Sequence, residues 1–120
     1  MPHIVFDKKL DLFHLSKNFT PIFQKNPILI KISSIFVEQN GLAALLPTVV
    51  IDKVHQEFLI EISTTELKTT IRLYPGTDPE KTDGVKSSMA LLSQFLINIF
   101  PDTKITRSNI YEFIDNVKTI

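Results

Sequence analysis

A segment with the alternation of a strand, followed closely by a long segment of helical period, places the strongest constraint on the fold of this chain. In Leu67–Tyr74 apolar and polar residues alternate, which is typical of a strand with one buried and one exposed face. Pro75-Gly76 ends that strand. In Asp78–Phe100 apolar residues recur every three or four positions, and Asp78 followed by Pro79 indicates a helix start. The sequence therefore predicts a sheet with a long helix packed against it.

The composition describes one globular domain over residues 1–120 and excludes several functional classes. Of the 120 residues, 43% are hydrophobic, which is enough for a substantial core. Thirteen basic and thirteen acidic residues cancel, so no basic surface for nucleic acid or an anionic membrane is expected. The absence of cysteine excludes disulfides and thiolate chemistry, and the three histidines lack metal-ligand spacing. Without a signal peptide or a long apolar stretch, we expect a soluble cytoplasmic protein.

The first third of the chain predicts one strand and helical structure after it. Pro2–Asp7 alternates as a short strand does. Asp11–Asn26 has apolar residues at three- and four-residue steps, which predicts an amphipathic helix with a kink or break at Pro21. Ile28–Phe36 is rich in β-branched residues, which favours a strand, but it follows a proline and precedes a glycine, which favours a helix. We expect a second helical piece there.

The remaining segments complete an α+β architecture. Pro47–Ile62 predicts one long strand whose alternation is kept if an extra residue near Lys53–Gln56 forms a β-bulge. The tail, Lys104–Ile120, fits a strand, a short helix or both. The predicted order indicates a sandwich in which two helices pack on one face of a small sheet. The other sheet face, which would carry Arg72 and Tyr74, is then either solvated or buried at a subunit interface.

Three motifs resemble the tautomerase superfamily, in particular its 5-carboxymethyl-2-hydroxymuconate isomerase branch. The first is the opening Met1–Phe6, with the sequence MPHIVF. The second is Ile35-Phe36 together with Gly41-Leu42, and the third is Thr70–Gly76 leading into the long helix. The resemblance touches most of the chain as far as Phe100, and the tail matches poorly.

The resemblance implies a β-α-β sandwich, a homotrimer with the bare sheet faces turned inward, and no cofactor. It also implies that Pro2, once Met1 is removed, moves a proton in an enol or dienol carboxylic acid. The branch usually has an arginine directly after the Gly-Leu pair to hold the substrate carboxylate, and this chain has Ala43 there. Losing one such contact commonly costs about 10²–10³ in rate. The chain therefore needs a substitute cation or has lost the activity.

Each candidate site residue has a plain structural alternative. Burial in an apolar pocket disfavours a charged amine, which would leave Pro2 neutral as a general base requires, and the alternative is an ordinary residue at a strand edge. Arg72 is the candidate cation, and its alternative is a solvated or intersubunit salt bridge. Tyr74 and Lys9 are candidate substrate-binding residues, and their alternatives are interface packing and a solvated strand end.

Three functions follow from these observations. The leading hypothesis is a cofactor-independent isomerase of a small carboxylate substrate, with Pro2 as base and Arg72 on the carboxylate. The alternative is a non-catalytic relative of the same fold that acts as a structural or ligand-binding oligomer, which Ala43 favours. The third is an unrelated α+β interaction module whose opening residues match by accident.

Overall fold

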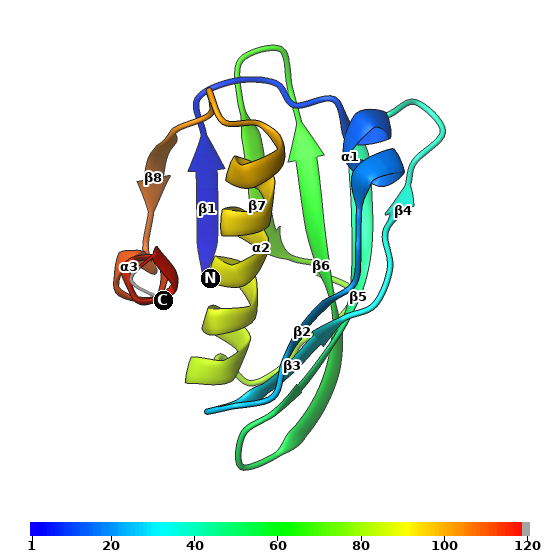
Figure 1. Cartoon of the computed structure of the whole chain (residues 1–120). Coiled ribbons are helices and arrows are strands. Elements are labelled where there is room, and N and C mark those ends of the chain that lie inside the picture. The colour runs from blue at the N-terminus through cyan, green and yellow to red at the C-terminus, as the bar shows by residue number, and fades with distance from the viewer. Residues whose placement is uncertain (119–120) are drawn as a thin grey trace.

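A strongly curved antiparallel sheet wraps around one long helix in the computed structural model of this chain, in which residues 1–118 are described (Figure 1). Chain order gives β1 (His3–Phe6), α1 (Leu12–Asn18), β2 (Ile22–Gln24), β3 (Leu29–Ile32), β4 (Phe36–Val37), β5 (Ala43–Ile51), β6 (His55–Thr64), β7 (Thr69–Leu73), α2 (Asp83–Ile99), β8 (Ile105–Ser108) and α3 (Tyr111–Lys118).

The eight strands form one sheet, and every pair of neighbours is antiparallel. Its order is β2-β3-β5-β6-β7-β1-β8, with β4 paired to β5 outside this path. One edge of β5 pairs with β6 along its whole length, from Ala43 opposite Ser63 to Ile51 opposite His55. The other edge is shared, because β4 pairs with its first half and β3 with its second half. β5 therefore has strands paired along both of its edges.

The long helix α2 lies in the concavity of the sheet and closes the core (Figure 1). It contacts β3, β5, β1 and β7. Thr82 caps its start by accepting a hydrogen bond from the Val85 backbone N–H at 3.3 Å. The helix ends at Ile99, ahead of Pro101, which cannot continue it. Its buried residues include Val85, Met89, Leu92 and Leu96, which the apolar period of the sequence had marked.

The predicted sandwich of a small β-α-β sheet with two helices is wrong. Ile28–Phe36 does not form a helix but supplies β3 and the start of β4, as its β-branched residues favoured. The predicted helix Asp11–Asn26 stops at Asn18, and Pro21 is followed by β2 in place of a further helical turn. β1 pairs antiparallel with β7 and β8, so no parallel β-α-β unit contains it. Residues 1–118 form eight strands and three helices, which is more strand and one helix more than the predicted sandwich has.

The long strand expected over Pro47–Ile62 is also wrong in its centre. The chain reverses at Asp52, whose carboxylate accepts the Lys53 backbone N–H at 2.7 Å, and β5 and β6 form a hairpin. The irregularity expected as a β-bulge is this turn. The helix start predicted at Asp78 moves to Thr82.

Three expected elements are confirmed in kind. β1 and β7 lie inside the predicted strands, and their alternation places Ile4, Phe6, Ile71 and Leu73 in the core. The tail contains both a strand, β8, and a helix, α3. Of the expected tail, residues 119–120 lie outside the described residues.

Candidate functional site

Pro2 lies buried at the start of β1, and a hydrogen-bonded clamp holds the residue before it. The side chain of Asn109 donates to the Met1 carbonyl at 2.7 Å and accepts the His3 backbone N–H at 3.0 Å. The Nδ1 atom of His3 also lies 3.1 Å from the Met1 carbonyl. The nitrogen of Pro2 is part of the Met1–Pro2 amide here, so it is not a base in this form of the chain.

Arg72 lies on β7, directly between two polar residues of the neighbouring strands. Its Cα partner on β1 is His3, and its partner on β6 is Glu61. The Nε atom of Arg72 donates to Glu61 Oε1 at 2.5 Å, with 46% of the arginine side chain and 13% of the glutamate side chain exposed. A substrate carboxylate would have to compete with Glu61 for this guanidinium, because the shielded glutamate already occupies one of its donors.

The other two predicted site residues lie in different places. Tyr74 lines a hollow of about 390 Å³ together with Phe36, Leu45 and Glu61. Lys9 follows β1 at the end opposite Pro2 and lines two hollows of about 350 and 370 Å³. The structure therefore brings Pro2 and Arg72 to neighbouring strand positions and Tyr74 to the same side of the sheet as Glu61, and it keeps Lys9 away from all of them.

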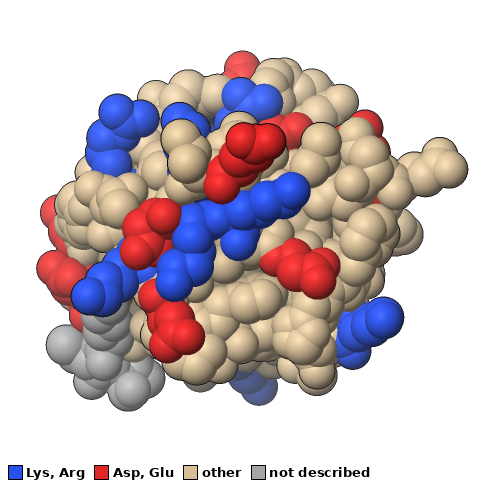
Figure 2. Space-filling view, turned by 90° about the horizontal axis from the view of Figure 1, so that it is seen from above, with Lys and Arg blue, Asp and Glu red and all other residues tan. Residues whose placement is uncertain are grey.

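The charged residues seen from above do not form a field of one sign. Figure 2 shows Lys and Arg interleaved with Asp and Glu on this face. Among the described residues, no group of His, Cys, Asp or Glu is arranged to hold a metal ion. No described helix has the length and apolar character needed to cross a membrane.

Another hollow lies between the β5–β6 turn and the start of α2. It measures about 520 Å³ and is lined by Pro27, Asp52 and Thr82, among others. The hydroxyl of Thr82 donates to the Asp52 carboxylate and lowers the pKa of that carboxyl, and backbone N–H groups, including that of Gly84, add to the effect against the opposing cost of burial. Because each partner is used in holding the turn against the helix, we assign this cluster a structural role.

β5 presents apolar side chains on both faces, and this feature distinguishes the outer side of the sheet. The inward residues Ala44, Leu46, Thr48 and Val50 are buried under α2. The outward residues are Ala43, Leu45, Pro47, Val49 and Ile51. None of the outward residues is fully buried, and Ile51 is 41% exposed. No described helix covers this side, because α2 lies in the concavity (Figure 1).

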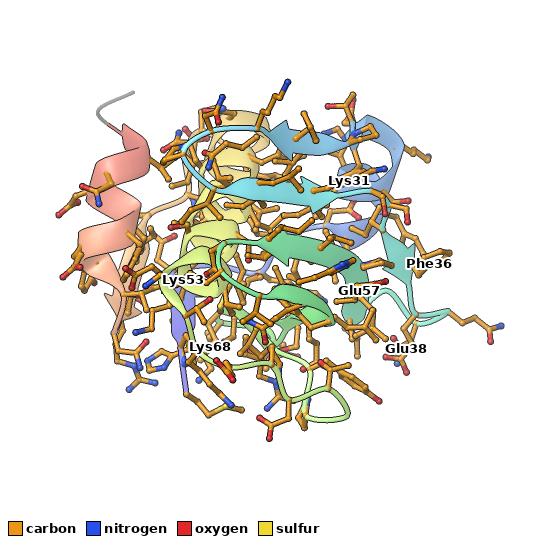
Figure 3. The ribbon with its side chains drawn as sticks, turned by 90° about the horizontal axis from the view of Figure 1, so that it is seen from below. Lys31, Phe36, Glu38, Lys53, Glu57 and Lys68 are labelled. Atoms are coloured by element: carbon orange, nitrogen blue, oxygen red, sulfur yellow. The ribbon has the colours of Figure 1, made fainter. Side chains whose placement is uncertain are left out.

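The strands beside β5 frame this row with polar and aromatic residues. On β3, Lys31 lies opposite Val49, and on β6, Glu57 lies opposite the same valine (Figure 3). Phe36 of β4 lies opposite Leu45 and is 64% exposed. We call the outward residues of β5 with Lys31, Glu57 and Phe36 the β5 face.

Sequence reasoning missed the β5 face, although a signal for it was present. Ala43–Ile51 reads AALLPTVVI, which is apolar at both odd and even positions. Such a strand is typical of sheets that are covered on both sides. The predicted strand begins at Pro47 and continues through the turn. It therefore omits Ala43–Leu46, and the apolar residues on both faces of β5 are not apparent from it.

Searches of protein-family models, of curated proteins and of solved structures find no match to this chain. The resemblance to the tautomerase superfamily consequently stays a prediction.

Proposed function

We propose that this chain is a non-catalytic binding protein that docks the outer side of its sheet, the β5 face, against another protein. The observation that carries the proposal is that every outward residue of β5 is apolar while no described element covers them. An antiparallel sheet with one solvated face normally alternates apolar and polar residues along each strand.

β6, which pairs with β5, and β7 beyond it carry charged outward residues, so β5 differs from both. On β6 the outward residues include Glu57 and Glu61, and on β7 they include Arg72. The same face of one sheet therefore changes from polar to apolar at β5. A contiguous apolar strip rimmed by charges is typical of a protein interaction site.

The geometry supports docking more than catalysis. The predicted base, Pro2, requires removal of Met1, whose carbonyl accepts a hydrogen bond from Asn109 and lies 3.1 Å from His3 Nδ1. The predicted carboxylate clamp, Arg72, is paired with Glu61. These contacts would have to be released before either residue could act on a substrate.

A proline-dependent isomerase remains the second candidate, and one observation favours it. Removal of Met1 would free the Pro2 amine beside His3, whose partner on the next strand is Arg72. The freed amine would then lie one residue before the partner of Arg72, and the substrate would have to reach both the buried proline nitrogen and the exposed guanidinium for proton transfer in a carboxylic acid. This candidate also requires that Arg72 exchange Glu61 for the substrate.

The docking proposal is tested by asking whether the β5 face is an accessible apolar surface. The fluorescence of an anilinonaphthalene sulfonate dye is compared between wild-type protein, Val49→Lys and a control, Leu67→Lys, on the monomeric fraction from size exclusion. Leu67 is 81% exposed and lies outside the β5 face, so the control removes an apolar side chain and adds the same charge elsewhere. Far-UV circular dichroism checks that each variant is folded.

We expect the dye to bind wild type and Leu67→Lys and to bind Val49→Lys much less, because the charge then lies within the apolar strip. A folded wild-type monomer that leaves the dye dark would refute the proposal. Equal loss of dye binding in the two variants would refute it as well, since binding would then not be localised to the β5 face.

A further inference from the structure

The charges beside β5 have an arrangement that suits one kind of partner. Lys31 and Glu57 flank Val49 on opposite sides at the same level of the sheet, each one strand away (Figure 3). Both side chains belong to exposed residues. Among the described residues Lys31 has no ion pair, and Glu57 has only His55, whose Nε2 atom lies 3.3 Å away and is charged only when that histidine is protonated.

We propose that a second copy of this chain is the partner that docks on the β5 face, about a two-fold axis that runs parallel to β5. This inference rests on the proposed docking function. A rotation about such an axis exchanges the two flanks of the strand, so the β3 side of one copy meets the β6 side of the other. Lys31 of each copy then faces Glu57 of the partner subunit, and the apolar rows of the two β5 strands meet in the centre.

Other in-plane arrangements lack this complementarity. A two-fold axis perpendicular to the strands would place Glu57 against Glu57 and Lys31 against Lys31, which is repulsive. Glu61, the next outward carboxylate along β6, is already paired with Arg72 inside its own chain. The whole chain has a formal net charge of zero, so two copies do not repel each other at long range.

The curvature of the sheet sets the size of the contact. Two convex surfaces with parallel strands touch along a strip, and the apolar row of β5 is such a strip. The nine residues of β5 span roughly 30 Å, and three strands are roughly 14 Å wide. The footprint is therefore roughly 400 Å² on each copy, or roughly 800 Å² in total, which is below the range of stable specific interfaces and in the range of weak, transient ones. We expect a dimer that dissociates on dilution.

The test is a charge exchange measured by sedimentation equilibrium over a concentration series. The proteins are wild type, Lys31→Glu, Glu57→Lys, the double variant with both changes, and the control Lys17→Glu. Lys17 is exposed on α1, outside the β5 face, so the control makes the same change of charge elsewhere. In the double variant each chain keeps its net charge, and the charges at positions 31 and 57 are exchanged.

We expect wild type and Lys17→Glu to approach twice the chain mass of 13.7 kDa as concentration rises. Each single variant should weaken the dimer by about tenfold or more, because like charges then face each other at two symmetric points. The double variant should return to within about threefold of the wild-type dissociation constant.

Two results would overturn the inference. A wild type that stays monomeric at every concentration excludes a second copy as the partner, and the docking proposal then stands or falls by the dye experiment alone. A dimer that the single variants leave unchanged, or that the double variant does not restore, excludes this axis. Failure of both the dye and the sedimentation experiments would remove the docking function itself.

Discussion

Replacing Gly84 with alanine tests whether the first turn of α2 packs on the sheet as tightly as the structure indicates. Gly84 is buried in this turn, and a Cβ added to it would lie 2.5 Å from Val50 Cγ1 and 2.8 Å from Asp52 Oδ2. It would also lie 3.2 Å from Ile28 Cγ2. Val50 is fully buried and β-branched, so moving its methyl group away from a new Cβ would disturb a packed core.

The net effect on stability is the difference of two opposing contributions. Alanine is a better helix former than glycine by up to about 1 kcal/mol, which favours the variant. Forcing an extra methyl group into a packed core typically costs about 1–3 kcal/mol. Displacing the Asp52 carboxylate adds to that cost, because it accepts hydrogen bonds from the turn and the helix start. We therefore expect Gly84→Ala to lower the free energy of unfolding by about 1–2 kcal/mol.

Thermal and urea denaturation measure this change. The expected loss corresponds to a fall in Tm of about 4–8 °C for a chain of this size. Ser87→Ala is the matched control, because Ser87 lies on the same helix at a partly exposed position, and its replacement should raise stability by a few tenths of a kcal/mol, roughly 0.3–0.5. A Tm of Gly84→Ala equal to or above that of wild type would refute the close packing of α2 on β5.

Three further changes test the core, the turn and the catalytic candidate. Leu46 is fully buried, so Leu46→Ala should lower stability by about 3 kcal/mol in urea titrations, and a loss well under 1 kcal/mol would contradict a closed core there. The hydroxyl of Thr82 holds the pKa of Asp52 below its ordinary value of 3.8, so this carboxylate stabilises the fold above that pH and the benefit disappears as pH falls through the lowered pKa. Asp52→Asn should therefore be less stable than wild type at neutral pH, by about 1 kcal/mol, and the difference should shrink in acid; a difference that grows on acidification would show the sign to be wrong. If the protein only docks, Met1-free protein should not turn over phenylenolpyruvate-type substrates above background in an absorbance assay, whereas turnover that Pro2→Ala abolishes would establish the isomerase.

The local signals that were unambiguous in the sequence predicted local structure correctly. Alternation around Ile71 and helical period around Met89 each have one physical explanation, a strand or a helix with one buried face, and both residues are in the core. The break at Pro21 was also readable, because proline cannot donate the hydrogen bond that a helix interior needs.

Ile28–Phe36 shows where local reasoning fails. Its residues fit a strand and its boundaries fit a helix, and the choice depends on which hydrogen-bonding partner is available. In the structure the second half of β5 pairs with Leu29–Ile32, with Leu29 opposite Ile51, so these residues form the strand β3. A partner more than twenty positions away along the chain is not visible in the segment itself.

The candidate site was predicted only in part. Pro2 and Arg72 were named from the sequence, and the antiparallel pairing of β1 with β7 does bring them to neighbouring positions. The pairing of Arg72 with Glu61 was not predictable, because it depends on the register of β6 against β7.

What the sequence alone determined is the set of apolar residues that favour burial, since apolar period and alternation depend only on the chain itself. The tertiary structure decided which of them are buried. The outward residues of β5 are as apolar as its inward ones, which even include Thr48, but α2 lies only on the concave side of the sheet. Val49 and Val50 are adjacent and identical, and only Val50 is fully buried. The difference arises because a curved sheet has one inside, and the long helix packs there, with buried residues of α1 and α3 completing the core.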